Sequence, residues 1–294
     1  MIRKAYIILV HKNPIQVCRL IKKLDDDHSV FFIHIDKKIN IAQFKNLLQI
    51  DDKIRFVKRV KTDWASYGLV TATLNALKEI KNAGEHFQQI ILLSGQDYPI
   101  KSNSFIDEFF RHSEYSLFIE YFQIPNYKKW QPRGGLYRID KYYFGAKLYQ
   151  KYAAKAVNLL AMNFSALKRK LPDNLIPYAG SQWWMIDMYA LNYILDFINS
   201  HPQYVSFHRF TFAADEVFFQ TILLNAKDEQ LLKRIANYNK RFIKHNSEKP
   251  HPEILTAKDL IAISNSDALL ARKFDEKVDS EIFNLIDTHC LNEN

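Results

Sequence analysis

The sequence predicts an α/β protein built on a mixed, mainly parallel β-sheet with helices on both faces. Short apolar runs alternate with amphipathic segments over the first half of the chain, which is typical of strands alternating with helices. The apolar runs are continuous, as expected for strands that lie buried under helices on both sides. The chain has 294 residues and no linker rich in Pro, Gly or Ser, so we predict a single domain spanning residues 1–294.

The elements of the first half follow from these patterns in order. Apolar runs that are too short for helices and are bounded by turn residues predict strands at 5–10, 30–35, 54–57 and 90–93. Apolar residues spaced three and four apart predict helices with one buried face at 14–24, 41–48 and 67–83. The polar residues that follow the strands are therefore expected at one edge of the sheet, where open α/β sheets bind ligands.

The second half is less regular and is expected to cover that edge. An irregular stretch rich in aromatic and basic residues at 127–144 leads into a basic helix at 146–170, and a loop at 176–185 leads into a strand. The remaining predictions are helices at 104–112, 189–200, 257–263, 267–273 and 281–289, a strand at 117–121, and a segment at 211–225 that becomes helical at Asp215.

The chain is basic, with a formal net charge of +9 at pH 7, which favours anionic partners such as a nucleotide phosphate or an anionic membrane surface. The basic residues form no nucleic-acid-binding motif, so we predict no nucleic-acid partner and leave peripheral membrane contact open. Cys18 and Cys290 form neither a metal-type spacing nor a disulfide framework, which indicates a reducing compartment. No apolar run is long enough to cross a bilayer.

The stretch 90–101, IILLSGQDYPIK, places Asp97 shortly after a predicted buried strand. Asp97 either belongs to a ligand site at the carboxyl edge or, with Gly95, only makes a turn before the next helix. Other strands are also followed by candidate rim residues, namely His11, Asp36, Asp63 and Trp64. A nucleotide site needs such a rim, because carboxylates bind ribose or ring nitrogens and an aromatic wall holds the base.

The sequence has no glycine-rich phosphate-binding fingerprint, which argues against NAD enzymes and P-loop NTPases. Asp215 and Glu216 open an apolar helical segment, FAADEVFFQTIL. Either the pair caps the helix and complements its dipole, or Glu216 faces a cleft as a general base.

Two further pairs also have alternative interpretations. Trp183 and Trp184, after a tight turn in GSQWW, either stack on sugar faces or fill the core. Arg272 and Lys273, in LLARKFD, are either cations at a helix C-terminus or ligands of a diphosphate.

Taken together, these stretches resemble the core-2/I-branching β-1,6-N-acetylglucosaminyltransferases and peptide O-xylosyltransferases, that is, glycosyltransferase family 14. The matching pieces run in family order and reach from the N-terminus to about residue 280, with a weakly matching middle at 122–174. They are AYIILVHKNPIQVCRLIKKL, FFIHIDKK, DWASYGLVTATLNALKEI, ILLSGQDYPIKS, GSQWWMI, DEVFFQTIL, and HPEILTAKDL with the later LLARKFD.

The resemblance implies a GT-A-type fold and an inverting transfer from a UDP-sugar. Residues 1–103 would bind the nucleotide sugar, and residues 104–294 would hold the acceptor and the catalytic base. The resemblance also implies that no metal or other cofactor is needed. The sequence agrees, because SGQD carries one carboxylate where most GT-A enzymes have a DxD pair.

The resemblance also assigns roles to residues. Glu216 is the implied catalytic base, and Lys273 is the implied ligand of the leaving diphosphate. Arg241 is the candidate for a second basic ligand, with Arg272 as the fallback. The predicted nucleotide rim consists of Val10, His11, Asp36, Asp63, Trp64 and Asp97. The predicted acceptor site consists of Glu120, Trp130, Ser181, Trp183 and Trp184.

The predicted function is therefore transfer of a sugar, first of all N-acetylglucosamine, from UDP to a hydroxyl of a glycan. Xylosyl or glucuronosyl transfer, and non-catalytic binding of a nucleotide sugar or carbohydrate, are the alternatives. Animal members carry a membrane anchor, a stem and disulfides, which this sequence lacks. The resemblance thus implies a minimal bacterial-type member in the cytoplasm. It would act on a surface or lipid-linked glycan, and contact with the inner membrane face is left open.

Overall fold

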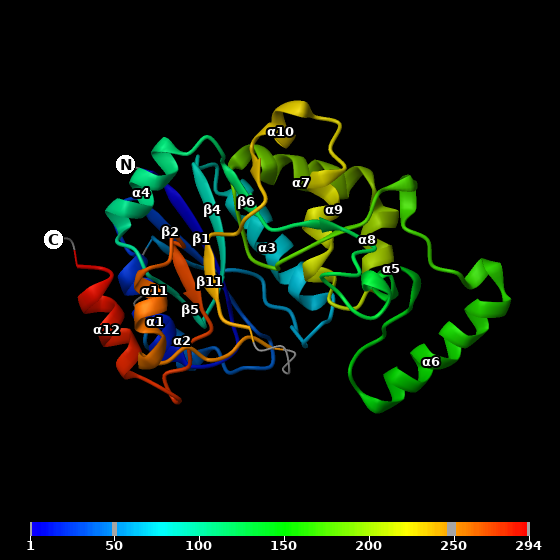
Figure 1. Cartoon of the computed structure of the whole chain (residues 1–294), viewed down its shortest axis with the longest axis horizontal. Coiled ribbons are helices and arrows are strands. Elements are labelled where there is room, and N and C mark those ends of the chain that lie inside the picture. The colour runs from blue at the N-terminus through cyan, green and yellow to red at the C-terminus, as the bar shows by residue number, and fades with distance from the viewer. Residues whose placement is uncertain (1, 49–51, 246–250, 293–294) are drawn as a thin grey trace.

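The structure is a computed structural model that describes residues 2–48, 52–245 and 251–292 (Figure 1). Its central sheet has seven strands. In spatial order they are β10 (Ile235–Ala236), β6 (Leu117–Ile119), β9 (Trp184–Ile186), β4 (Gln89–Ser94), β1 (Lys4–Val10), β2 (Ser29–Ile35) and β3 (Ile54–Phe56). β4, β1, β2 and β3 run parallel, as do β10 and β6, whereas β9 is antiparallel to both of its neighbours.

Both faces of this sheet are buried, because successive strand residues point to opposite sides. In β1, Ile7 packs into one core and Ile8 into the other. The helices that contribute to the first core are α3 (Gly68–Asn82), α7 (Met188–Ser200), α8 (Pro202–His208), α9 (Phe218–Leu224) and α10 (Glu229–Lys233). Those that contribute to the second are α1 (Pro14–Leu24), α2 (Ala42–Lys45), α4 (Asn103–His112), α11 (Leu260–Ser264) and α12 (Glu281–His289).

Smaller elements extend this sandwich. β5 (Asp97–Pro99), β12 (Leu270–Arg272) and β11 (Arg241–Ile243) form a second sheet in the order β11-β12-β5. β7 (Phe122–Gln123) pairs with β8 (Tyr178–Ala179) in a two-stranded ribbon. The helices α5 (Tyr137–Asp140) and α6 (Leu148–Asn163) lie between β7 and β8 in the sequence. Figure 1 shows that α6 projects from the rest of the molecule.

The predicted α/β class, with a mainly parallel sheet and helices on both faces, is confirmed. The helices at 14–24 and 281–289 begin and end where the sequence predicts. The prediction of a helix at 267–273 is wrong, since this segment contains β12, which pairs with β5 and β11. A short apolar run has no period that distinguishes a strand from a helix. The basic helix predicted at 146–170 is shorter and ends at Asn163.

Candidate functional site

The carboxyl ends of β1 and β2 lie side by side at one edge of the central sheet. Val10, the last residue of β1, pairs with Ile35, the last residue of β2, and β4 ends at the same level on the other side of β1. The next residues along the chain, His11 and Asp36, therefore start the loops at this edge. Val10 is buried and His11 is exposed, so of the two only His11 presents a side chain to solvent.

The Asp36 carboxylate ties the end of β2 to the loop that follows β3. It accepts hydrogen bonds from the Lys38 amide at 2.9 Å and from the Thr62 hydroxyl at 2.7 Å. Burial acts to raise the pKa of Asp36, but these hydrogen bonds outweigh it, and the pKa is lowered. Asp36 is therefore an ionised carboxylate that orders the rim of the predicted nucleotide site.

Asp63 and Trp64 lie in the loop after β3, which is held to Asp36 by the hydrogen bond from Thr62. The Lys38 ammonium lies 2.7 Å from the Asp63 carboxylate. Trp64 is 58% exposed and meets Phe212 and His251 edge to face. An exposed indole next to a fixed loop offers a surface on which a base or a sugar ring can stack.

Asp97 does not face the rim, contrary to the prediction. It is fully buried, and its Oδ2 accepts hydrogen bonds from the amide and the hydroxyl of Ser94 at 2.7 and 2.6 Å. Its carboxylate also lies 3.4 Å from Arg241 Nε and 3.8 Å from Arg272 Nη1. The predicted contact of Asp97 with a nucleotide is therefore corrected. Asp97 instead balances the positive charges of two buried arginines below the surface of the site.

Arg241 and Arg272 differ in how many of their side-chain nitrogens have a hydrogen-bond partner. Arg241 has no exposed side-chain surface, and its Nη1 and Nη2 donate to the carbonyls of Asn239 and Leu92. Arg272 lies 4.0 Å over the Trp183 ring, and its Nε and Nη1 have no hydrogen-bond partner among the described residues. Burial lowers the pKa of both arginines, that of Arg241 to about 10. Arg241 cannot reach a bound diphosphate from this position, so the fallback, Arg272, replaces it as the candidate.

Lys273 follows β12 at the point where the loops after β1, β4 and β12 meet. The loops after β4 and β12 are joined by a backbone hydrogen bond of 2.9 Å, and Lys12 Nζ lies 2.6 Å from the Asp275 carboxylate. Burial, followed by the positive charges of Lys12 and Arg272, lowers the pKa of Lys273. This crowding of positive charge makes the corner favourable for a bound anion.

Glu216 ends a short 3₁₀ helix, Ala214–Glu216, and only Val217 separates it from α9. Its carbonyl accepts a hydrogen bond from the Gly180 amide at 2.9 Å. A Cβ atom at position 180 would lie 1.8 Å from the carbonyl oxygen of Glu120, so only glycine permits this approach. Gly180 thus brings the backbones of Glu120 and Glu216 to the same turn.

Arg138 is the partner of Glu216 that sequence reasoning missed. Its Nη1 lies 2.6 Å from Glu216 Oε2, and its guanidinium lies 3.7 Å over the Trp130 ring. The side chain of Arg138 is 9% exposed and that of Glu216 is 35% exposed, so the carboxylate still reaches solvent. The sequence signal was only that Arg138 lies in the aromatic and basic stretch at 127–144, which contains several other cations.

Asp215 caps no helix, although its position before α9 suggested a capping role. It is buried, and its Oδ1 has no hydrogen-bond partner among the described residues. Burial, followed by the negative charge of Glu216, raises the pKa of Asp215 to about 7. The two adjacent carboxyl groups therefore differ sharply, since one is enclosed and the other is partly exposed beside a cation.

Both tryptophans are buried in the first core, which favours core filling, the second of the two alternatives that the sequence left open. Trp184 is fully buried and packs against Phe219, with ring centroids 5.4 Å apart, so it fills the core and its predicted place in the acceptor site is corrected. Trp183 is 8% exposed and lies beneath Arg272. Its amide donates to the Ser181 hydroxyl at 3.3 Å, which keeps Ser181 in the same turn.

The turn at 180–183 therefore joins two chemically different groups. On one side Trp183 supports Arg272, which precedes Lys273. On the other side Gly180 contacts Glu216. The first group can hold an anion, and the second can accept a proton from a bound hydroxyl.

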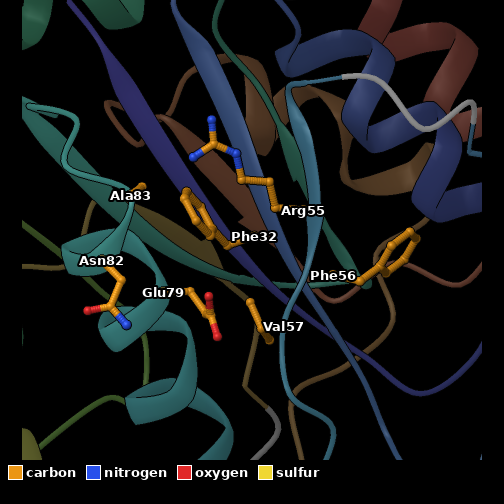
Figure 2. A pocket seen from close by; sticks show the side chains of 7 residues that line it. All are labelled: Phe32, Arg55, Phe56, Val57, Glu79, Asn82 and Ala83. Carbon is orange, nitrogen blue, oxygen red and sulfur yellow. The ribbon is translucent and has the colours of Figure 1, made fainter.

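A cavity of about 190 Å³ is lined by none of these residues, and Figure 2 shows the side chains that surround it. It lies between β2, β3 and the last turn of α3, which precedes β4 and so points to the amino edge of the sheet. Its lining residues are Phe32, Arg55, Phe56, Val57, Glu79, Asn82 and Ala83. It is at the wrong edge to belong to the candidate site.

In residues 2–48, 52–245 and 251–292, no group of three or more His, Cys, Asp and Glu side chains is arranged to hold a metal ion. In the same residues, no helix combines the length and the apolar character needed to cross a bilayer.

Comparison with known proteins gives one family and several distant relatives. The family described as Core-2/I-Branching enzyme matches residues 4–265. Xylosyltransferase 2 of Rattus norvegicus is 23% identical, over 98% of this chain and 34% of its own length. The β-1,3-galactosyl-O-glycosyl-glycoprotein β-1,6-N-acetylglucosaminyltransferase 4 of Mus musculus is 23% identical, over 94% of this chain and 62% of its own length.

This chain thus spans about a third of the first of these relatives and less than two thirds of the second. Among solved structures, that of mouse xyloside xylosyltransferase 1 in its apo form is 8% identical and covers 91% of this chain and 97% of its own. Its TM-score of 0.36 is too low to establish a shared fold.

Proposed function

The chain belongs to the Core-2/I-Branching enzyme family, and from this premise we propose that it is an inverting glycosyltransferase with a UDP-sugar donor. The observation that carries the proposal is the turn at 180–183, which contacts the backbone of Glu216 through Gly180 and the guanidinium of Arg272 through Trp183. A glycosyltransferase needs both groups. A proton must leave the acceptor hydroxyl while negative charge builds up on the departing diphosphate.

In the proposed reaction, Glu216 takes the proton of an acceptor hydroxyl. The hydroxyl oxygen bonds to the anomeric carbon from the face opposite the diphosphate. The bond between that carbon and the diphosphate oxygen breaks, and the bonding electrons leave with UDP. The transition state has oxocarbenium character, as in glycosidic chemistry generally. Arg138 keeps the Glu216 carboxylate in place, and Glu120, Trp130 and Ser181 border the acceptor.

On the donor side, Arg272 and Lys273 would take up the charge of the diphosphate. Arg272 suits this role better than Arg241, because its side chain is 10% exposed and its Nε and Nη1 make no hydrogen bond to the described residues, whereas the Arg241 side chain is fully enclosed. The uridine would then lie along the loops that follow the first strands, near His11, Asp36 and Trp64. Asp63 lies at the exposed margin of the same rim.

We also propose that the transfer needs no metal. In metal-dependent GT-A enzymes a carboxylate after the central strand faces the metal and the diphosphate. Here the single carboxylate of SGQD, Asp97, is enclosed between Arg241 and Arg272. Arg272 and Lys273 would instead supply the positive charge that a divalent ion supplies to a diphosphate.

N-acetylglucosamine is the proposed donor sugar, with xylose and glucuronic acid as alternatives. The two relatives described above are named as a xylosyltransferase and an N-acetylglucosaminyltransferase, which leaves the choice between these sugars to experiment. The proposed acceptor is a bacterial surface glycan, free or lipid-linked, and the proposed compartment is the cytoplasm. The formal net charge of +9 would favour contact with an anionic inner membrane face.

The proposal is tested first by a thermal-shift and calorimetry screen of UDP, UDP-N-acetylglucosamine, UDP-xylose and UDP-glucuronic acid. Each ligand is measured in EDTA and in manganese, because a ligand of the native state raises the melting temperature. We expect one UDP-sugar to bind in EDTA. Binding only in manganese would overturn the metal-free proposal, and no binding of any UDP compound would overturn the donor class.

A second measurement separates an enzyme from a binding protein on the same fold. The UDP-sugar that binds is incubated with the protein, and the release of UDP is followed with and without added glycan acceptors. We expect slow hydrolysis that depends on Glu216. Tight binding without any UDP release would favour a non-catalytic nucleotide-sugar or carbohydrate-binding protein.

A further inference from the structure

Helix α6 carries a large apolar surface that the rest of the described chain leaves uncovered. Within residues 148–163, which the structure describes in full, only Ala154 is buried. Eight of the twenty exposed large apolar side chains of the described residues fall between 148 and 167. They are Leu148, Tyr149, Tyr152, Leu159, Leu160, Met162, Phe164 and Leu167. This concentration is unlike the singly scattered apolar residues of an ordinary protein surface.

The six exposed apolar residues within α6 form a broad ridge that covers about 160° around the helix axis, on the side that faces away from the protein. At about 100° per residue, Leu148, Tyr152 and Leu159 fall within about 40° of one another around the helix axis. Ala154, the buried residue, lies roughly on the opposite side of the axis by the same rule. Figure 1 shows the helix projecting from the body of the molecule, and the three ridge residues named here are each more than 60% exposed.

The same segment carries only positive charge. Residues 141–172 contain seven basic residues and no Asp or Glu. Five of the lysines are exposed: Lys147, Lys151, Lys155, Lys168 and Lys170. A surface that combines exposed tyrosines and aliphatic residues with lysines is complementary to an anionic lipid headgroup layer over an apolar interior.

The segment is firmly attached at its base, next to the candidate site. Arg169 Nη2 donates to the Phe207 carbonyl and to the Thr211 hydroxyl, both at 2.8 Å. Arg169 Nη1 donates to the carbonyls of Arg138 and Lys141. The backbone that anchors α6 is therefore the backbone that carries Arg138, the partner of Glu216.

We propose that α6 and residues 164–170 are a docking surface for an anionic lipid bilayer. The apolar ridge enters the boundary between headgroups and acyl chains, the tyrosines lie at the headgroup level, and the lysines extend to the lipid phosphates. A second copy of this chain fits the surface less well, because a two-fold contact would bring equivalent lysines together. The inference goes beyond glycosyl transfer, since docking needs neither donor nor acceptor.

The test is co-flotation of the whole protein with vesicles of phosphatidylcholine alone or mixed with phosphatidylglycerol, without nucleotide. We expect binding only to the mixed vesicles and a loss of binding at high salt. The variant L148S/L159S removes two apolar side chains from the centre of the ridge, and K151E/K155E reverses two charges on the same helix. Each is expected to lower the partition coefficient at least about tenfold.

Matched controls separate this surface from the general charge of the protein. K78E/K227E changes the net charge by the same amount on exposed lysines of the main body, and I261S/V278S removes two exposed apolar side chains elsewhere. Both controls are expected to bind vesicles as the unchanged protein does. The proposal is overturned if K78E/K227E loses binding as strongly as K151E/K155E, or if L148S/L159S binds normally.

Analytical ultracentrifugation of the same variants decides whether a second copy occupies the surface. A dimer that L148S/L159S dissolves, together with no binding to mixed vesicles, would make α6 a self-association surface and overturn the proposal. UDP binding, measured on every variant, is expected to be unchanged. A failure of vesicle binding with intact UDP binding therefore refutes the docking surface and leaves the proposed transferase standing.

Discussion

The Nη1 atom of Arg138 lies 2.6 Å from Oε2 of Glu216, although the two residues are 78 positions apart in the sequence. Arg138 is itself held, because its guanidinium lies 3.7 Å over the Trp130 ring and its side chain is 9% exposed. Because Arg138 already restricts the Glu216 side chain, the carboxylate loses little rotamer entropy when an acceptor binds. Glu216 is therefore preoriented, as a positioned general base requires.

Replacing Glu216 with Gln should reduce turnover by about 100-fold or more, since the amide keeps the shape of the side chain and cannot take up a proton. Binding of UDP should not change, because Glu216 is on the acceptor side of the turn at 180–183. Initial rates at saturating donor and calorimetric titration with UDP measure the two effects. Full activity of the Gln variant would remove Glu216 from the mechanism.

Replacing Arg138 with Met should lower kcat by about tenfold or more, because the Glu216 carboxylate loses the partner that orients it. The KM for the donor should stay within about twofold, since the donor does not contact Arg138 in the proposed arrangement. R138K is the matched variant and should recover part of the rate, because it restores the charge without the planar stack on Trp130. A fall in donor affinity with an unchanged kcat would contradict the positioning role.

Replacing Lys273 with Met should weaken UDP binding by about tenfold, the usual effect of losing a hydrogen bond between charged groups. Lys277, an exposed residue of the same loop, provides the control, because K277M removes the same charge four positions away. Isothermal titration with UDP at low and moderate salt distinguishes a direct contact from a general field effect. Equal losses for K273M and K277M would argue against a direct contact.

We predict that Arg241 contributes to the stability of the folded protein and not to binding of the diphosphate. R241M should lower the free energy of unfolding by about 3 kcal/mol, since Asp97 loses one of its two buried cationic partners. D97N/R241M should not recover that loss, because Arg272 would then be a buried cation without its carboxylate partner. Urea denaturation measures both changes. A stable R241M protein with weakened UDP binding would restore Arg241 as a phosphate ligand.

The sequence predicted the parallel core well because each of its strands carries its own signal. The runs at 5–10 and 90–93 are apolar on both faces, and the helix at 14–24 has one buried stripe. No such signal marks the direction of β9 or the existence of the sheet that contains β12, since both depend on pairing with distant segments.

The candidate site was predictable as a set of residue types but not as a set of contacts. The sequence could mark Asp97 and Arg241 as candidates. It could not show that each is the buried partner of the other, because 144 positions separate them. Arg138 was missed for the same reason, since nothing local distinguishes it from the exposed cations around it.

The raised pKa of Asp215 predicts that this residue makes the folded protein less stable as the pH rises. The folded-state pKa, about 7, exceeds the ordinary value of 3.8, so the folded protein keeps a proton that the unfolded chain releases. The stability contribution is therefore fully present below about pH 4 and is lost as the pH rises through about 7. D215N keeps an uncharged group of the same shape and should remove this dependence.

Measured by urea denaturation, the stability of D215N relative to the unchanged protein should increase by about 2–3 kcal/mol between pH 5 and pH 8. Comparing the two proteins at each pH cancels the titration of all other groups. E216Q is the control for the cause, because it removes the neighbouring charge that helps to raise the pKa of Asp215. The pH dependence in E216Q should therefore be smaller than in the unchanged protein but not absent, since burial, the larger cause, remains. A D215N protein whose relative stability does not change with pH would show that Asp215 is already ionised in the folded state.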